Sequence, residues 1–142
     1  MLKILVTGSR VATLEMLELV DQIVLDAKAD GCEIIVGDAE GVDARVINQC
    51  DLLKVPITVY GAYEKLRRRA RTGLNYGLKG TYPQRDLYMA ERCDVCVAAW
   101  NGVSRGTRIT FEAAATFGKP VTVYDCSGPL VRKIRYNEAT HA

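Results

Sequence analysis

The chain alternates short, β-branched apolar segments with longer segments whose apolar residues recur every three or four positions. The short segments have the length and composition of buried strands, and the longer ones have the periodicity of amphipathic helices. Strands are expected at Lys3–Thr7, Glu33–Val36, Val55–Tyr60, Val95–Trp100 and Val121–Tyr124. This alternation favours an α/β fold, in which right-handed helical crossovers join parallel strands and helices cover both faces of the sheet.

A Rossmann-like, doubly wound sheet of about five parallel strands in the order 3-2-1-4-5 fits this pattern. Helices are expected at Thr13–Ala29, Val42–Leu53, Gln84–Arg92 and Thr107–Phe117. Residues 61–83 are rich in Arg, Gly and Tyr, and they predict a short helix, Tyr63–Arg71, followed by a loop. The tail after Cys126 is compatible with a small helix or an ordered arm. The 142 residues contain no repeat and no linker, so one domain, residues 1–142, is expected.

The composition is that of an ordinary globular protein, with 49% hydrophobic and 25% charged residues. No apolar run reaches the roughly 18–20 residues of a membrane span, and no membrane partner is expected. The net charge of +2 does not by itself indicate a nucleic-acid partner. Five basic residues nevertheless fall within Lys65–Arg71. Such a run is usually a solvated face, although it is also suited to close over an anionic ligand.

The five cysteines are an odd number, are scattered along the chain and follow no secretory signal. This usage predicts reduced thiols in a cytoplasmic protein. Cys93 and Cys96 have CxxC spacing, but no second pair completes a zinc site. They also straddle a helix end and a strand start, which points the two sulfurs apart. Neither a metal nor a cofactor is expected.

Four loops follow strands or open helices at the point where the strand order of such a sheet reverses: Gly8-Ser9-Arg10, Gly37–Asp43, Arg85-Asp86 and Asn101–Thr107. Ligands of doubly wound sheets bind at that point, outside the carboxyl ends of the strands. The last loop opens directly onto a helix, so its backbone N–H groups lie at the positive end of a helix dipole. A phosphate-binding pocket is therefore expected at this edge of the sheet.

Arginines and glycines in these loops have two explanations each. Arg10 and Arg105 are suited to bidentate phosphate binding, but ion pairs with Asp38 or Asp43, or exposure to solvent, would also account for them. Glycine lets the backbone approach a ligand closely, and it also permits tight turns. Both explanations apply to Gly8, Gly37, Gly41 and Gly106. Three hydroxyl side chains are suited either to contact the ligand or to cap helices: Ser9, Ser104 and Thr107.

Other candidates are carboxylates and aromatic rings. Asp43 lies in the first turn of its helix, where it would accept a ribose hydroxyl or simply stabilise the helix dipole. Arg85 and Asp86 open another helix that faces the same site. Aromatic side chains near strand ends are suited to stack on a base or to fill the core: Tyr60, Tyr63 and Trp100. His141, next to the end of the sequence, is expected to have no chemical role.

Together, the GSR turn at residues 8–10, the segment GDAEGVD at 37–43, Arg85-Asp86 and the segment SRGT at 104–107 resemble the SLOG superfamily. These are Rossmann-like domains related to the cytokinin-activating, lysine-decarboxylase-like phosphoribohydrolases and to the DNA processing protein A family. The resemblance extends over nearly the whole chain and is strongest to a small bacterial and phage branch. It implies a ligand with a nucleotide or phosphoribosyl group held by the glycine loops, and a homo-oligomer that is a dimer or larger.

One position departs from the related enzymes. The phosphoribohydrolases and the nucleoside deoxyribosyltransferases carry a glutamate three residues after the threonine of this loop, where the present chain has Thr110. Glu112 lies two residues further, about 200° around a helix. A hydroxyl lacks the charge that attacks or stabilises an oxocarbenium-like centre. The remaining candidates for a catalytic carboxylate are Asp43, Asp86 and Glu112.

The leading hypothesis is a protein that binds a nucleotide or nucleotide-derived small molecule, as a sensor, a carrier or a sequestering protein. The alternative is a hydrolase or transferase that acts on the N-glycosidic bond of a nucleoside or its monophosphate. A third class, single-stranded nucleic-acid binding through the arginine-rich segment, is the least favoured because the net charge is small.

Overall fold

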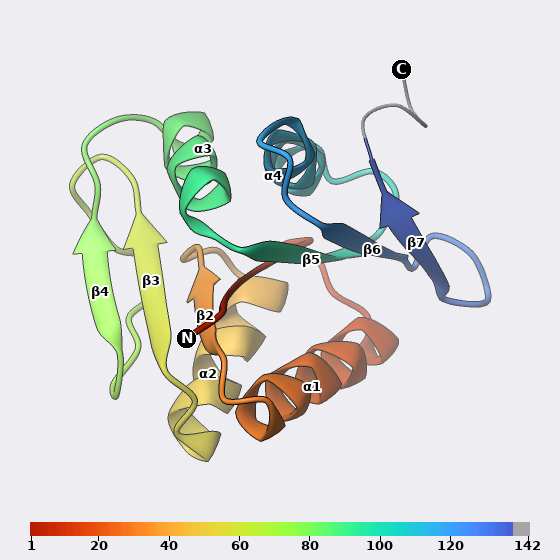
Figure 1. Ribbon diagram of the computed structural model, residues 1–142, viewed down its shortest axis with the longest axis horizontal. Coiled ribbons are helices and arrows are strands. Elements are labelled where there is room, and N and C mark those ends of the chain that lie inside the picture. Colours follow the sequence, from red (N-terminus) through yellow and green to blue (C-terminus); the bar gives the residue numbers. More distant parts are fainter. Residues whose placement is uncertain (138–142) are drawn as a thin grey trace.

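The computed structural model describes residues 1–137, in which helices cover both faces of a seven-stranded sheet (Figure 1). The strands are β1 (Lys3–Gly8), β2 (Glu33–Val36), β3 (Ile57–Gly61), β4 (Leu74–Gly77), β5 (Val95–Trp100), β6 (Val121–Asp125) and β7 (Arg132–Tyr136). The helices are α1 (Leu14–Ala29), α2 (Val42–Leu53), α3 (Tyr82–Arg92) and α4 (Arg105–Thr116). His141 lies outside the described residues.

The sheet order is β4-β3-β2-β1-β5-β6-β7, and every neighbouring pair is parallel except β6 and β7. The five expected strands form its centre in the predicted order, so the doubly wound α/β fold is confirmed. The expected number of strands was wrong, because β4 and β7 extend the sheet at its two edges. Most residues of both edge strands are exposed, so they lack the apolar pattern that marks a buried strand.

The helix expected at Tyr63–Arg71 is absent, and this segment forms turns and bends. Two of its backbone N–H groups donate to carboxylates far away in the sequence instead of to the preceding turn. The N–H of Arg67 donates to Asp38 Oδ2 at 2.7 Å. The N–H of Arg71 donates to the carboxylate of Asp51, at the end of α2, at 2.9 Å. The first acceptor holds Arg67 at the carboxyl ends of the strands, and the second holds Arg71 beside the end of α2.

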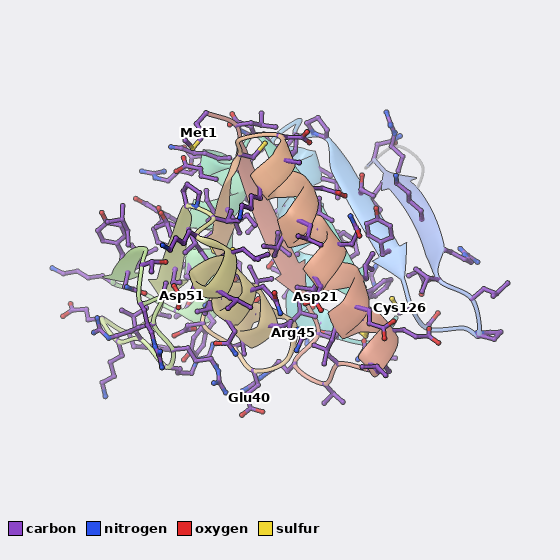
Figure 2. The ribbon with its side chains drawn as sticks, turned by 90° about the horizontal axis from the view of Figure 1, so that it is seen from below. Met1, Asp21, Glu40, Arg45, Asp51 and Cys126 are labelled. Atoms are coloured by element: carbon purple, nitrogen blue, oxygen red, sulfur yellow. The ribbon has the colours of Figure 1, made fainter. Side chains whose placement is uncertain are left out.

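Two apolar cores lie on opposite faces of the sheet. Helices α1 and α2 cover one face and bury residues such as Val20 and Val46, and α3 and α4 cover the other with Met89 and Phe111. The first two helices are also joined by an ion pair (Figure 2) between Arg45 and Asp21, with two N–O distances of 2.7 Å. No helix within residues 1–137 is long and apolar enough to cross a membrane.

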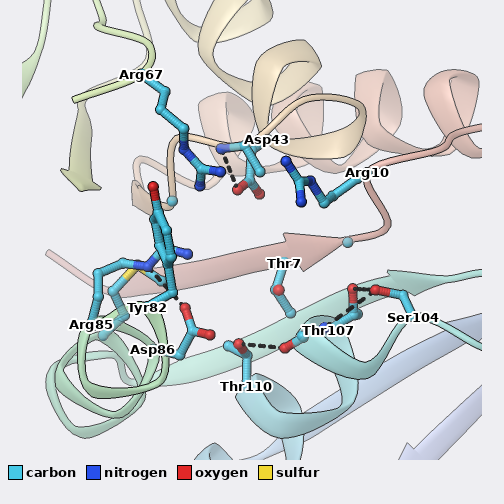
Figure 3. A pocket seen from close by; sticks show the side chains of 15 residues that line it. Thr7, Arg10, Asp43, Arg67, Tyr82, Arg85, Asp86, Ser104, Thr107 and Thr110 are labelled. Carbon is cyan, nitrogen blue, oxygen red and sulfur yellow. Dashed lines mark hydrogen bonds and ion pairs between the residues drawn. The ribbon is translucent and has the colours of Figure 1, made fainter. Parts of the chain in front are cut away.

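The switch point of the sheet lies between β1 and β5, which are adjacent and parallel. The chain leaves β1 and β5 in opposite directions across the sheet, so that α1 and α2 cover one face, and α3 and α4 cover the other. The starts of α2, α3 and α4 consequently surround the carboxyl ends of the central strands, where the predicted loops meet (Figure 3).

Candidate functional site

A cavity of about 260 Å³ opens at the carboxyl ends of the central strands (Figure 3). Its walls come from the end of β1, the loop between β2 and α2, the segment after β3, and the first turns of α3 and α4. Most of the predicted site residues line it: Gly8, Arg10, Gly37, Asp43, Arg85, Asp86, Ser104, Gly106 and Thr107. Ser9, Asp38, Gly41 and Arg105 do not. The four loops therefore meet at one cavity, and ligand binding by these residues stays a prediction.

The α4 wall is built from backbone N–H groups and hydroxyls. Ser104 is the N-cap residue of α4, and its Oγ lies 2.9 Å from Thr107 Oγ1. The loop before it is held from two sides, because Trp100 Nε1 donates to the Ser104 carbonyl and Asn101 Oδ1 accepts the Ser104 N–H. Within residues 1–137, the N–H groups at the first two positions of α4 have no recorded acceptor. These free donors, at the positive end of a helix dipole, suit an anion.

The opposite wall holds a network of buried charges centred on Asp38, which is 1% exposed. Asp38 Oδ1 accepts from Arg67 Nη2 at 2.8 Å and from Arg85 Nη1 at 2.9 Å. Arg85 also donates from Nε to Asp86 Oδ1 at 2.9 Å. Burial opposes the ionisation of Asp38, but hydrogen bonds from Arg67 and the two positive charges together hold its pKa below the usual value. Asp38 thus fixes both arginines from behind the cavity.

Asp43 and Asp86 line the cavity and are nearly buried, at 6% and 7% exposed. Burial raises the pKa of Asp43 to about 7, although the N–H of Ala39 donates to its Oδ2 at 3.1 Å. Burial also raises the pKa of Asp86, against the opposing charge of Arg85. Carboxyls with raised pKa values in a cleft are typical of functional sites.

Two of the predicted glycines have structural explanations. A Cβ atom on Gly8 would overlap the side chain of Val42, so this glycine lets α2 pack against the end of β1. Gly41 has a φ of 71°, and a Cβ there would overlap the carbonyl oxygens of Ser9 and Arg10. A Cβ on Gly106, in contrast, would meet no protein atom within 4 Å. Among these three, only Gly106 leaves open space at the cavity.

Several predicted residues lie outside the cavity. Ser9 is fully buried, and its Oγ accepts the N–H of Asn101 at 3.1 Å, which ties two loops together. Arg105 is exposed and does not line the cavity. Glu112 lies on another side of α4, where it accepts from Arg108 Nε at 2.7 Å. Glu112 is therefore not placed to act on a molecule in the cavity.

The aromatic candidates are also placed elsewhere, and another ring takes their position. Trp100 packs against Phe111, and Tyr60 packs against other tyrosines. The ring that lines the cavity is Tyr82, at the start of α3, with the guanidinium carbon of Arg67 4.2 Å from its centroid. The sequence signal for Arg67 was the basic run, which did not single out one residue, and no pattern distinguished Tyr82.

Thr110 also lines the cavity, from the second turn of α4. Its hydroxyl donates to the Gly106 carbonyl at 3.0 Å and lies against the carboxyl of Asp86. The position where related enzymes carry a glutamate thus faces the cavity with a hydroxyl. Within the described part of the chain, no group of three or more His, Cys, Asp or Glu side chains is arranged to hold a metal ion.

No protein-family model and no curated protein matches the chain. Three solved structures are similar in fold. DNA processing protein A from Helicobacter pylori, described as binding single-stranded DNA, has a TM-score of 0.70 and 20% identity over 86% of this chain and 64% of its own. The molybdenum cofactor carrier protein of Chlamydomonas reinhardtii has a TM-score of 0.69 and 18% identity over 86% of this chain and 75% of its own.

The third similar structure is TM1055, a structural genomics target, with a TM-score of 0.68 and 20% identity over 85% of this chain and 72% of its own. The shared feature is the fold. All three neighbours have SLOG-type, Rossmann-like folds, which is consistent with the resemblance of the sequence motifs. At these identities the similarity carries no residue roles from one chain to another.

Proposed function

We propose that the chain binds a nucleotide-type small molecule in the cavity, with the phosphate of the ligand at the start of α4. One observation carries this proposal: Gly106, whose backbone N–H has no acceptor within residues 1–137, lines the same cavity as Arg10. Backbone N–H groups and the helix dipole favour a phosphate there, and a guanidinium adds a charged donor. Similar folds in a cofactor carrier and a DNA-binding protein support a ligand-binding role.

The size of the cavity limits the ligand. Small-molecule sites commonly enclose about 300–1,000 Å³. A volume of about 260 Å³ lies just below that range. It favours a mononucleotide over a dinucleotide, and the ring of Tyr82 supplies an aromatic surface in the same cavity. A nucleoside monophosphate is therefore the best-matched class of ligand.

The test is isothermal titration calorimetry with nucleoside monophosphates, with inorganic phosphate and the parent nucleosides for comparison. We expect the monophosphates to bind and the nucleosides to bind much more weakly. Arg10→Gln should lower the affinity for the monophosphates. Lys28→Gln, in the last turn of α1 and away from the cavity, should leave it unchanged. Failure of every monophosphate to bind would contradict the proposal. Salt-sensitive binding of an oligonucleotide without binding of mononucleotides would favour nucleic acid instead.

A second candidate function is hydrolysis or transfer at the N-glycosidic bond of the bound nucleotide. The observation that favours it is the pair of buried carboxyls in the cavity, Asp43 and Asp86, whose raised pKa values suit acid–base chemistry near neutral pH. Against this function, Thr110 stands where the enzymes that the sequence resembles carry the glutamate that acts as nucleophile. Chromatography of free base after incubation with monophosphates tests this function, and base release that Asp43→Asn or Asp86→Asn abolishes would establish it.

A further inference from the structure

Asp43 is a cavity-lining carboxyl that makes no ion pair within 4 Å among residues 1–137, although the charges of Arg85 and Arg67 act on it from a longer distance. The nearby arginines are directed elsewhere. Arg85 donates to Asp38, to Asp86 and to the Tyr60 carbonyl. Within residues 1–137, Arg67 donates its hydrogen bonds to Asp38 alone. Arg10 lines the cavity but makes no recorded ion pair.

The recorded hydrogen bonds use only one oxygen of this carboxyl. Asp43 Oδ2 accepts the N–H of Ala39 at 3.1 Å, and Oδ1 accepts no recorded hydrogen bond within the described residues. No buried side-chain oxygen or nitrogen in this part of the chain lacks a partner, so Oδ1 retains access to the cavity. A nearly buried carboxylate without a direct ion pair is costly. A hydrogen-bond donor on a ligand would remove much of that cost.

We propose that Asp43 accepts hydrogen bonds from the ribose hydroxyls of a nucleoside monophosphate and so selects ribonucleotides over 2′-deoxyribonucleotides. This inference rests on the function proposed above. In a nucleotide the sugar is the group next to the phosphate, so in a small cavity it is the first donor-bearing group beyond α4. In doubly wound folds an acidic residue after the second strand often binds ribose. Asp38 and Asp43 both follow β2, but the arginines already occupy both oxygens of Asp38.

The surroundings of Asp43 make this selection sensitive to pH. Asp38 and Asp86 face it with negative charges that disfavour its ionised form, and Arg85 opposes them. Arg67 and Arg10 line the same cavity from two further segments. A hydroxyl donor prefers the ionised carboxyl. The preference for ribose should therefore increase as the pH rises through about 7, the value to which burial raises the pKa of this group.

The test measures the affinities of adenosine 5′-monophosphate and its 2′-deoxy analogue by calorimetry. A hydrogen bond to a charged group predicts a ribose preference of about tenfold or more at pH 8. The variant Asp43→Asn should reduce this ratio to about one while it keeps the affinity for the deoxy ligand. Glu40→Gln, which removes an exposed charge from the same loop, should keep the wild-type ratio. Thermal melting of both variants checks that they fold.

The outcomes separate this inference from the function on which it rests. A wild-type ratio near one, or a ratio that Asp43→Asn leaves unchanged, would overturn the role of Asp43 while monophosphate binding stands. Binding of neither nucleotide would overturn both. If Asp43→Asn does not fold, the wild-type protein still decides the matter. A ribose preference that is the same at about pH 6 and about pH 8 would contradict the inference, and one that is smaller at pH 6 would support it.

Discussion

The two walls of the cavity lie at the same end of the sheet but present different chemical groups. The α4 wall presents neutral donors, which are free N–H groups beside Ser104 and Thr107. The opposite wall presents charges that are largely neutralised by one another around Asp38. A wall of free donors is ready to bind an anion without rearrangement. The paired charges of the opposite wall hold one another in place, and Asp43 is the carboxylate of that wall that makes no ion pair within residues 1–137. The first wall is suited to hold a phosphate and the second to distinguish what is attached to it.

Among substitutions in the two walls, Asp38→Ala is expected to have the largest effect on stability. It removes the carboxylate that joins two arginines and leaves Arg85 buried with one carboxylate fewer. Breaking a buried ion pair from one side costs about 3–5 kcal/mol. Urea denaturation should show a loss of that order. Asp21→Ala, which removes a more exposed ion pair with Arg45, is the matched control, with an expected loss below about 1 kcal/mol. Equal losses would show that burial of the Asp38 network is unimportant.

Asp43→Asn should change how stability depends on pH. The pKa of Asp43 is raised from 3.8 to about 7, so the folded protein binds a proton between these values that the unfolded chain releases. The contribution of this group to stability is therefore full below about pH 4 and is lost as the pH rises to about 7. The asparagine variant should lack this loss and be more stable than wild type at pH 8, by on the order of 4 kcal/mol.

Chemical denaturation of both proteins at several pH values between about 4 and 8 measures the difference. Asp38 provides a contrast, since its pKa is lowered and its contribution is lost as the pH falls instead. If the free energies of unfolding of Asp43→Asn and wild type change in parallel across this range, Asp43 is not protonated in the folded state near neutral pH.

These pH effects depend on contacts that the sequence pattern did not reveal. Periodicity was sufficient to locate the five central strands, which are apolar and largely buried, and the doubly wound topology supplied their order. It failed for β4 and β7, whose residues are mostly exposed, and for Tyr63–Arg71, where distant carboxylates replaced helical acceptors. Pairing partners far apart in the sequence leave no local signal.

For the candidate site, the sequence predicted which loops meet but not which side chains line the cavity. The topological rule brought the right loops together, since it depends only on strand order. It did not give the directions of side chains, so Arg105 was expected at the cavity and is exposed, while Arg67 and Tyr82 line it. Gly8 and Gly41 showed a related ambiguity, because close packing and ligand approach both require glycine.

Gly106→Asp tests the α4 wall without disturbing the fold. An acidic residue in the first turn of a helix stabilises it by about 0.3–1 kcal/mol, and a side chain here starts in open space. Its carboxylate would also repel a phosphate at the free N–H groups. We expect unchanged or higher thermal stability and at least about a tenfold loss of monophosphate affinity. Gly106→Asn is the neutral control of similar size, and an equal loss with both variants would indicate steric blocking rather than charge.

The smallest effect is expected for Glu112→Gln. This side chain lies away from the cavity and pairs with Arg108 one turn earlier on an exposed face. Loss of such an exposed pair should change the stability very little. Monophosphate affinity and any release of base should be unchanged. A clear loss of either would mean that Glu112 reaches the ligand, and would restore it as a catalytic candidate.

The most direct test of phosphate binding at α4 is a titration of the ¹⁵N-labelled protein with adenosine 5′-monophosphate, followed by amide chemical shifts. Binding at the start of α4 predicts that the largest changes occur at the amides of residues 105–107, with smaller changes at residues 8–10. The indole N–H of Trp100, which donates to the Ser104 carbonyl, should move with them. Saturable binding that leaves the amides of residues 105–107 unchanged would contradict the account.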